Sequence, residues 1–513
     1  MQPETASPSL PTEIWTQIIQ CLPAHYQRSC LSVSKVFHDI ALQFVFASVT
    51  VRLGNVRDFY LADEDRWCNW NNLEKADADA AVARSYELLQ HIARSPSGFA
   101  PVVKQVSVRA YAFPGHDPPV EFLDALEEAL SVLRLRAFAW YGCHPIPRPQ
   151  VLQVLSTTSH ETMEVLLLPA EPMDYTPVLA IGRLKSLSFL NRYGDRYQPL
   201  EKKDARIARM AQTITGAAAS SSSLRSLGIF DKVLKKLTVQ HLTTLVDLTL
   251  TLVGRVDPLK TVFTHCAQLR SLTLLAGLAH QDALTALLHA HASALPRLTS
   301  LQLFYQPVSS AVVSAVAAFL RPKLQLERLD LGYHWDESRY GNIEPVLRVL
   351  PMLPRLRVLG LELSDSAISE LGLAEGARMP DVLLRLGECV PPGLTALSLW
   401  VTAQFQTPEM AMAEDVEDAS AGVRECRFVH VSINTFYSER DELRRALFEH
   451  PPPRAELVGV HEDMRWVERD PQTGERVGYS ESWPLSRVYN RTADDFGCEE
   501  WEWLMRQVDL RIL

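Results

Sequence analysis

Few side chains in this sequence combine a reactive type with a spacing that supports catalysis. The chain contains no P-loop, GxGxxG, HExxH or GxSxG motif, and the segment 478–482, GYSES, departs from the nucleophile elbow at its last residue. His289 and His291 lie two apart in an apolar helical pattern, near His280. Residues two positions apart on a helix point to different faces, so these histidines form a poor metal site. We expect no catalysis by this chain, no metal and no cofactor.

Composition excludes several other classes. The net charge of -10 argues against a nucleic-acid binder held by phosphate contacts. No uninterrupted apolar run reaches the roughly 18 residues that indicate a membrane span. The first residues lack a basic region followed by an apolar core, and none of the 8 cysteines forms a CxxC pair. These features predict a chain with reduced thiols in the cytoplasm and/or nucleus, without nucleic-acid or membrane partners.

Leucine is concentrated in the middle of the chain. It supplies 73 of the 513 residues, and 52 of these lie within 151–400. They fall in the pattern apolar-x-x-apolar-x-apolar, repeated every 21 to 40 residues between 103 and 426. Leucine-rich repeats run about 20–29 residues, and the sequence resembles them, although the asparagine that often follows the last motif leucine is missing. The motif begins at Val103, Leu135, Met163, Leu184, Leu224, Leu245, Leu269, Leu298, Leu326, Leu356, Leu394 and Cys426.

The motif spacing predicts short strands joined by helices. Apolar residues at the fourth and sixth motif positions alternate toward one face of a strand, and a parallel neighbour needs a return of a dozen or more residues. Helical returns open at Asp257-Pro258 and Gln281-Asp282, for example. The predicted fold class is α/β: a small helical N-terminal module and a solenoid with a parallel sheet on its concave face and helices on its convex face. A doubly wound α/β domain is the alternative, but no glycine-rich phosphate turn follows any strand.

The first fifty residues carry a different pattern. Leu10-Pro11 precedes Ile14, Ile18 and Leu22, spaced four apart as on one helix face, and Pro23 ends it. A leucine and the block VSKVF, 33–37, follow. This order, LPxEI then LP then VSKxF, resembles the F-box, and the whole is similar to fungal F-box proteins with divergent leucine-rich repeats.

The resemblance implies docking on the Skp-type adaptor of a cullin–RING ubiquitin ligase. The chain would then be the substrate-recognition subunit of a Skp–cullin–F-box ligase, leading a protein substrate to ubiquitination and proteasomal degradation. The alternative is a non-catalytic leucine-rich-repeat scaffold outside a ligase. For Leu31, Val33 and Phe37, a place in the module's own core is an equal alternative. The adaptor-binding residues implied by motif position are Leu10, Pro11, Ile14, Ile18, Leu22, Leu31, Val33 and Phe37.

Aromatic residues six and seven positions after the first motif leucine suggest where a substrate binds. Strand residues between the motif leucines face the open side of a solenoid, and exposed aromatics there suit a binding surface. Covering by insertions or by the C-terminal segment is the alternative. The predicted patch is Phe304, Tyr305, Tyr333 and Trp400.

The remaining segments complete the predicted organisation. Residues 216–223, GAAASSSS, predict a mobile loop. A hairpin at 467–479 and a final helix at 494–508 predict a cap over the last repeat. We expect an F-box at 8–51, a joining segment at 52–102, a solenoid at 103–455 and a cap at 456–513.

Overall fold

The fold is taken from a computed structural model, which describes most of the chain. The described residues form two compact units, one built from residues up to 224 and one from 225 onward. The described residues are 10–22, 24–54, 72–112, 118–170, 173–190, 200–221, 223–251, 256–276, 281–305, 310–333, 343–364, 379–402, 423–433, 443–445, 447–483 and 499–506.

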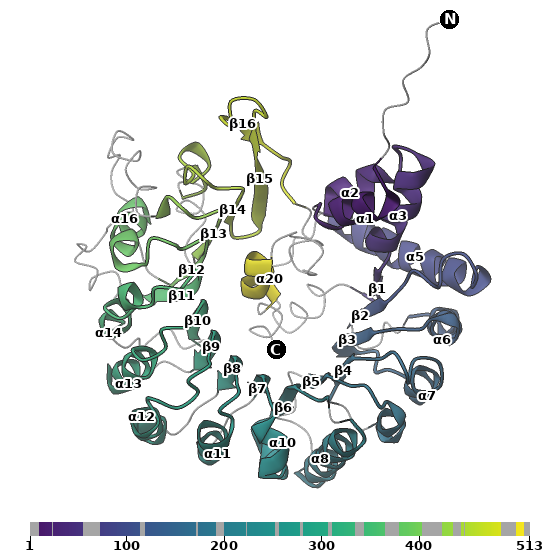
Figure 1. The fold of residues 1–513 in the computed structure, drawn as a ribbon, viewed down its shortest axis with the longest axis horizontal. Coiled ribbons are helices and arrows are strands. Elements are labelled where there is room, and N and C mark those ends of the chain that lie inside the picture. The colour runs from purple at the N-terminus through teal and green to yellow at the C-terminus, as the bar shows by residue number, and fades with distance from the viewer. Residues whose placement is uncertain are drawn as a thin grey trace, which may run out of the picture. The chain divides into compact units, whose positions relative to one another are not determined.

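The first unit combines a three-helix module with five parallel strands. Strands β1 to β5 pair in chain order, and the connecting helices line one face of the layer (Figure 1). The module comprises α1 Thr12–Gln20, α2 Ala24–Cys30 and α3 Lys35–Val45. The strands are β1 Ser48–Arg52, β2 Gln105–Tyr111, β3 Ala137–His144, β4 Val165–Pro169 and β5 Ser186–Leu190, and the returns are α5 Asn72–Arg94, α6 Val120–Val132, α7 Pro149–Thr158, η1 Thr176–Ala180 and α8 Leu200–Ser220.

The second unit repeats the same alternation and ends differently. Strands β6 to β14 are parallel in chain order, whereas β15 and β16 are antiparallel. The strands are β6 Ser226–Phe230, β7 Asp247–Thr251, β8 Ser271–Ala276, β9 Ser300–Tyr305, β10 Arg328–Tyr333, β11 Val358–Ser364, β12 Ala396–Thr402, β13 Phe428–Ile433, β14 Leu457–Val460, β15 Asp463–Arg469 and β16 Arg476–Tyr479. The helices are α9 Asp231–Leu234, α10 Val239–Thr243, α11 Asp257–His265, α12 Gln281–Ala290, α13 Ser310–Leu320, α14 Glu344–Leu347, η3 Leu350–Met352, α16 Met379–Cys389 and α20 Glu499–Arg506.

The motif leucines form the core between strands and helices. Leu245, Leu248 and Leu250 of one repeat are fully buried, and equivalent residues pair across strands, as Leu248 does with Leu272. Burial of each such side chain contributes about 1.5–3 kcal/mol, so a strand shifted by one residue would expose the whole set. The predicted α/β solenoid with an N-terminal helical module is confirmed.

Main-chain hydrogen bonds join successive repeats where the strands begin. The Glu327 carbonyl accepts N–H groups from Arg357 at 2.8 Å and Val358 at 3.1 Å, and the Arg357 carbonyl likewise accepts from Thr395 at 2.8 Å. These bonds recur from repeat to repeat and need no particular side chain. They hold the repeats together although the asparagine typical of leucine-rich repeats is missing.

Three segments differ from their predicted place. Strand β1 pairs with β2, so the sheet starts before residue 103, and β14 continues it past residue 455. The stretch 216–220 is the end of α8, not a loop, because its small residues let the helix pack closely and Ala217 is fully buried. Helix α20 lies on the inner side of the second unit's strands, opposite the connecting helices (Figure 1).

The buried thiols provide a test of this core. Burial raises the pKa of Cys266 and of Cys426 to about 12, whereas Cys21 is exposed. Because the thiolate is the reactive form, iodoacetamide at pH 8 should modify Cys21 and spare Cys266 and Cys426 until the chain is denatured. Peptide mass spectrometry measures the three rates in one sample, and equal rates in the folded protein would contradict the described packing.

Candidate functional site

The N-terminal module has its own small core. Ile19, Cys30, Ile40 and Ala41 are buried together where the three helices meet. Five partly buried side chains pack against this cluster, namely Trp15, Leu22, Leu31, Phe37 and Phe44. The Trp15 and Phe37 rings are 4.8 Å apart, and the Ser34 hydroxyl caps α3 by accepting the Phe37 N–H at 3.3 Å. This core is minimal, as expected for a module of about forty residues.

Other apolar side chains of the module point away from that core. Ile14 and Ile18 lie one turn apart on α1 and are exposed, whereas the neighbouring Ile19 is buried. Exposed fractions run from 39% at Ile14 to 64% at Val33. A small soluble module rarely exposes so many large apolar residues unless a partner covers them. This set, the exposed apolar set, consists of Leu10, Ile14, Ile18, Tyr26, Val33 and Val36.

The eight residues assigned by motif position fall into two groups. The first group is exposed, as an interface requires, and consists of Leu10, Pro11, Ile14, Ile18 and Val33. Their assignment to an adaptor interface stays a prediction. Leu22, Leu31 and Phe37 pack against the module's core, which gives them a structural task. Tyr26 and Val36 are exposed as well, although motif position does not single them out: Tyr26 follows no apolar periodicity, and Val36 lies within the VSKVF block.

The predicted aromatic patch on the strands is only partly exposed to solvent. Phe304 is 6% exposed, because its ring lies over Gly332: a Cβ at residue 332 would stand 2.5 Å from the Phe304 Cδ1. Phe304 is therefore not the exposed anchor that we predicted. Trp400 is partly exposed, and the side chains of Tyr305 and Tyr333 lie outside the described residues. The patch as a whole stays a prediction that now depends on Trp400.

Polar side chains form a buried row on the same face of the strands. The Thr273 hydroxyl donates to the Gln302 Oε1 at 2.8 Å, and the Gln302 amide donates to the Asp330 carboxylate at 3.4 Å. Thr273, Gln302 and Asp330 come from the consecutive strands β8, β9 and β10, and all are buried. Burial raises the pKa of the Asp247 carboxyl on β7, against hydrogen bonds from Ser271 and Ser226 that lower it. Sequence reasoning missed this row because the residues are 28 and 29 apart in the chain.

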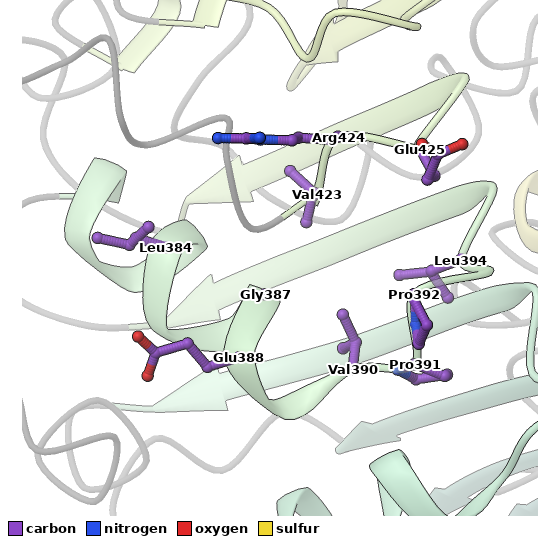
Figure 2. Close-up of a pocket in the computed structure, with 10 residues that line it drawn as sticks. All are labelled: Leu384, Gly387, Glu388, Val390, Pro391, Pro392, Leu394, Val423, Arg424 and Glu425. Atoms are coloured by element: carbon purple, nitrogen blue, oxygen red, sulfur yellow. The ribbon is translucent and has the colours of Figure 1, made fainter.

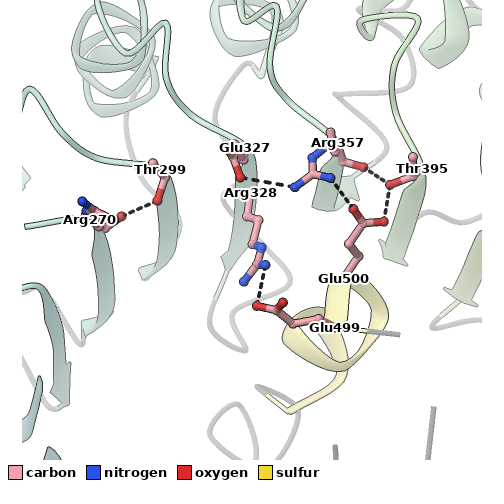
Figure 3. A network of polar contacts seen from close by, with 8 residues as sticks. All are labelled: Arg270, Thr299, Glu327, Arg328, Arg357, Thr395, Glu499 and Glu500. Carbon is pink, nitrogen blue, oxygen red and sulfur yellow. Dashed lines mark hydrogen bonds and ion pairs between the residues drawn. The ribbon is translucent and has the colours of Figure 1, made fainter. Parts of the chain in front are cut away.

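Helix α20 contributes the second polar network on this face (Figure 3). Glu499 pairs with Arg328 at 2.7 Å, and Glu500 pairs with Arg357 at 2.9 Å. The Thr395 hydroxyl donates to Glu500 at 2.7 Å. The three partners belong to successive repeats, at or just before the starts of β10, β11 and β12. The C-terminal helix is thus fixed to the face where a substrate was expected.

A surface hollow of about 380 Å³ lies between the end of α16 and the segments that lead into β12 and β13 (Figure 2). Its lining mixes apolar side chains with two acids. Glu388 pairs with Arg385 at 2.9 Å and Glu425 pairs with Arg454. Both acids at this hollow are therefore engaged in ion pairs with neighbouring arginines.

Two further searches bear on the possible chemistry. Within the part of the chain that the structure describes, no group of three or more His, Cys, Asp or Glu side chains could hold a metal ion. No described helix has the length and apolar composition needed to cross a bilayer.

The two groups of module residues should respond differently to mutation. Phe37→Ala should lower the free energy of opening of helices α1–α3 by about 2–4 kcal/mol, because a ring packed on the core is lost. Val33→Ala should change it by less than about 0.5 kcal/mol, as expected for an exposed residue. Native-state hydrogen exchange of the full chain measures both, and an equal loss in the two variants would contradict the division into core and exposed apolar set.

Comparison with known proteins identifies an F-box domain in the N-terminal module. A search of curated proteins found no match. Among solved structures, the chain is similar to the leucine-rich repeat-containing protein LegL7 from Legionella pneumophila, at 13% identity and a TM-score of 0.25, covering 77% of this chain and 92% of that chain. The model of the F-box domain matches residues 7–47, the segment that ends directly before β1. The resemblance of the N-terminal module to the F-box is thereby confirmed.

Proposed function

We propose that this protein is the substrate-recognition subunit of a Skp–cullin–F-box ubiquitin ligase. The observation that carries the proposal is that the segment matched by the F-box domain, 7–47, is also the segment whose apolar side chains remain exposed after its core is filled. F-box domains typically bind a Skp-type adaptor through helices of this kind. An exposed apolar helix face suits a helix-in-groove interface.

The solenoid supports the second half of the proposal. Parallel repeats present a long series of outward side chains on one face, a common platform for protein partners. A receptor acts by proximity, because it raises the local concentration of substrate lysines near the conjugating enzyme. Such a role needs no catalytic residue in this chain.

A binding scaffold outside a ligase is the alternative. It would use the solenoid in the same way and leave the F-box as a folding unit or a contact to another protein. The exposed apolar set favours the ligase, because a module kept for its fold alone has no need of six exposed large apolar side chains. Adaptor binding is the property that separates the two functions.

Adaptor affinity should depend on the exposed apolar set. Ile18→Ala and Val33→Ala should each weaken binding of a purified Skp-type adaptor by roughly 10- to 100-fold, as expected for an apolar residue at an interface centre. Isothermal titration calorimetry with the full chain measures the change. Val120→Ala is the matched control, because Val120 on α6 is 62% exposed and lies outside the F-box. Wild-type affinity in both F-box variants would remove these residues from the interface.

Mutation of the N-terminal motif should affect adaptor binding and leave substrate binding unchanged. Changing Leu10 and Pro11 to Ala should remove the adaptor and cullin from material captured with the full chain, while substrate proteins stay bound, because the two surfaces lie on different elements. Quantitative mass spectrometry of captured complexes compares this variant with wild type. Failure of the wild-type chain to capture an adaptor and a cullin would contradict the proposed function itself.

A further inference from the structure

Helix α20 is a short helix with two distinct sides. Three of its first four residues are acidic, Glu499, Glu500 and Glu502, which suits the positive end of a helix dipole. Trp501, Leu504 and Met505 follow the i, i+3, i+4 spacing of one helix face, and each is at most 2% exposed. The helix therefore buries a compact apolar face and carries its acidic residues in its first turn.

The seat of α20 is built from side chains of the strands. The Trp501 ring stacks 5.4 Å from that of Phe428 and lies 5.6 Å from that of Trp466. Leu504 approaches β11 at Gly360, where a Cβ would stand 3.1 Å from the Leu504 Cδ2. A Cβ at residue 360 would also stand 2.1 Å from the Asp330 Oδ1, so the glycine leaves room for the Asp330 carboxylate and for Leu504 of the helix.

Charge fixes the direction of the helix in this seat. Arg328, Arg357 and Thr395 stand at the beginnings of three neighbouring strands, and all three hold the first turn of α20 (Figure 3). A helix lying the other way round would bring its C-terminal end to the two arginines. The seat is therefore complementary to a helix with an acidic first turn.

The leucine core of the solenoid does not include α20. The leucine core lies on the opposite face of the strands, and the described backbone hydrogen bonds include none between α20 and a strand. Among the described residues the buried Trp501 Nε1 has no hydrogen-bond partner, which lowers the stability of the docked state. A helix of 8 residues is also unstable by itself in water, so it unfolds when it leaves the seat.

We propose that the face of β10–β13 is a binding site for one short helix with an acidic first turn and a Trp/Leu/Met face, that α20 occupies this site in cis, and that a protein substrate with a helix of the same chemistry displaces it. The substrate class rests on the proposed function. Occupation of the site itself does not, because it involves no adaptor. Displacement requires a competitor that overcomes the high effective concentration of a tethered segment.

Hydrogen exchange of the wild-type full chain tests whether α20 is a bound ligand or part of the core. The amides of 499–506 should exchange at least 100-fold faster than those of β11, because α20 opens while the strands stay paired. Equal protection of α20 and β11 would show that the helix leaves only when the solenoid unfolds, and would overturn the proposal. This measurement needs no variant, so it stands even if a variant misfolds.

A peptide tests the specificity of the site. A labelled peptide of residues 499–506 should bind the full-chain variant Trp501→Ala/Leu504→Ala, whose own helix is undocked, at least tenfold more tightly than the wild type. Fluorescence anisotropy measures both. The proposal would be overturned if the folded variant bound the peptide no more tightly than the wild type does. Loss of the variant's near-UV circular dichroism would also overturn it.

A charge exchange then tests the arginine contact. A peptide with Glu500→Arg should bind this variant at least tenfold more weakly, and adding Arg357→Glu to the variant should restore binding. Arg385→Glu is the control, since Arg385 lies on α16 and pairs with Glu388. If Arg357→Glu and Arg385→Glu both restored binding of the Glu500→Arg peptide, or if neither did, the proposed contact between Glu500 and Arg357 would be contradicted. No adaptor is present, so these results are independent of adaptor binding, which calorimetry reports separately.

Discussion

Burial of apolar side chains at three fixed positions in each repeat is the constraint on which the rest of the structure depends. Each motif leucine contributes about 1.5–3 kcal/mol by leaving water, and a strand can satisfy all three positions in only one register. Leu329 therefore pairs with Leu301 on one side and Leu359 on the other. Once these positions are fixed, every residue between them is also placed in a row across the sheet.

The rows on the other face follow from that register. Thr273, Gln302 and Asp330 are neighbours because their repeats align, and the same alignment places Arg328, Arg357 and Thr395 within reach of one helix. The core residues must be apolar, whereas the outward residues are free to vary. A solenoid can therefore acquire a specific binding face without loss of its fold, and in this chain part of that face holds α20.

The sequence predicted what depends on local periodicity. The motif spacing predicted where the strands lie, and the four-residue spacing of apolar residues near the N-terminus predicted the first helix of the F-box. Long-range packing was less accessible. Phe304 is buried because Gly332, 28 residues later, leaves room for its ring, and no local pattern reports such a pair. The 494–508 helix was predicted as an element, but its place depends on Arg328 and Arg357, far from it in the chain.

The F-box illustrates the same division at small scale. Period-four spacing predicted the helix with Ile14 and Ile18, whereas motif position assigned Leu22 and Phe37 to the same surface, with the module's own core as an equal alternative for Phe37. In the structure these two pack inward, because three short helices must fill a core before they can offer a surface. Helix pairing decides which apolar residues remain outside, and pairing is a property of the folded module.

The central claim is that the apolar residues left outside that core receive an adaptor. Hydrogen exchange of the full-length chain, with and without a purified Skp-type adaptor, tests it most directly. The account predicts slower exchange in α1 and around residues 26–36 on adaptor addition, with unchanged exchange in β6–β14. Unchanged exchange throughout the module at saturating adaptor, or protection confined to the solenoid, would contradict it.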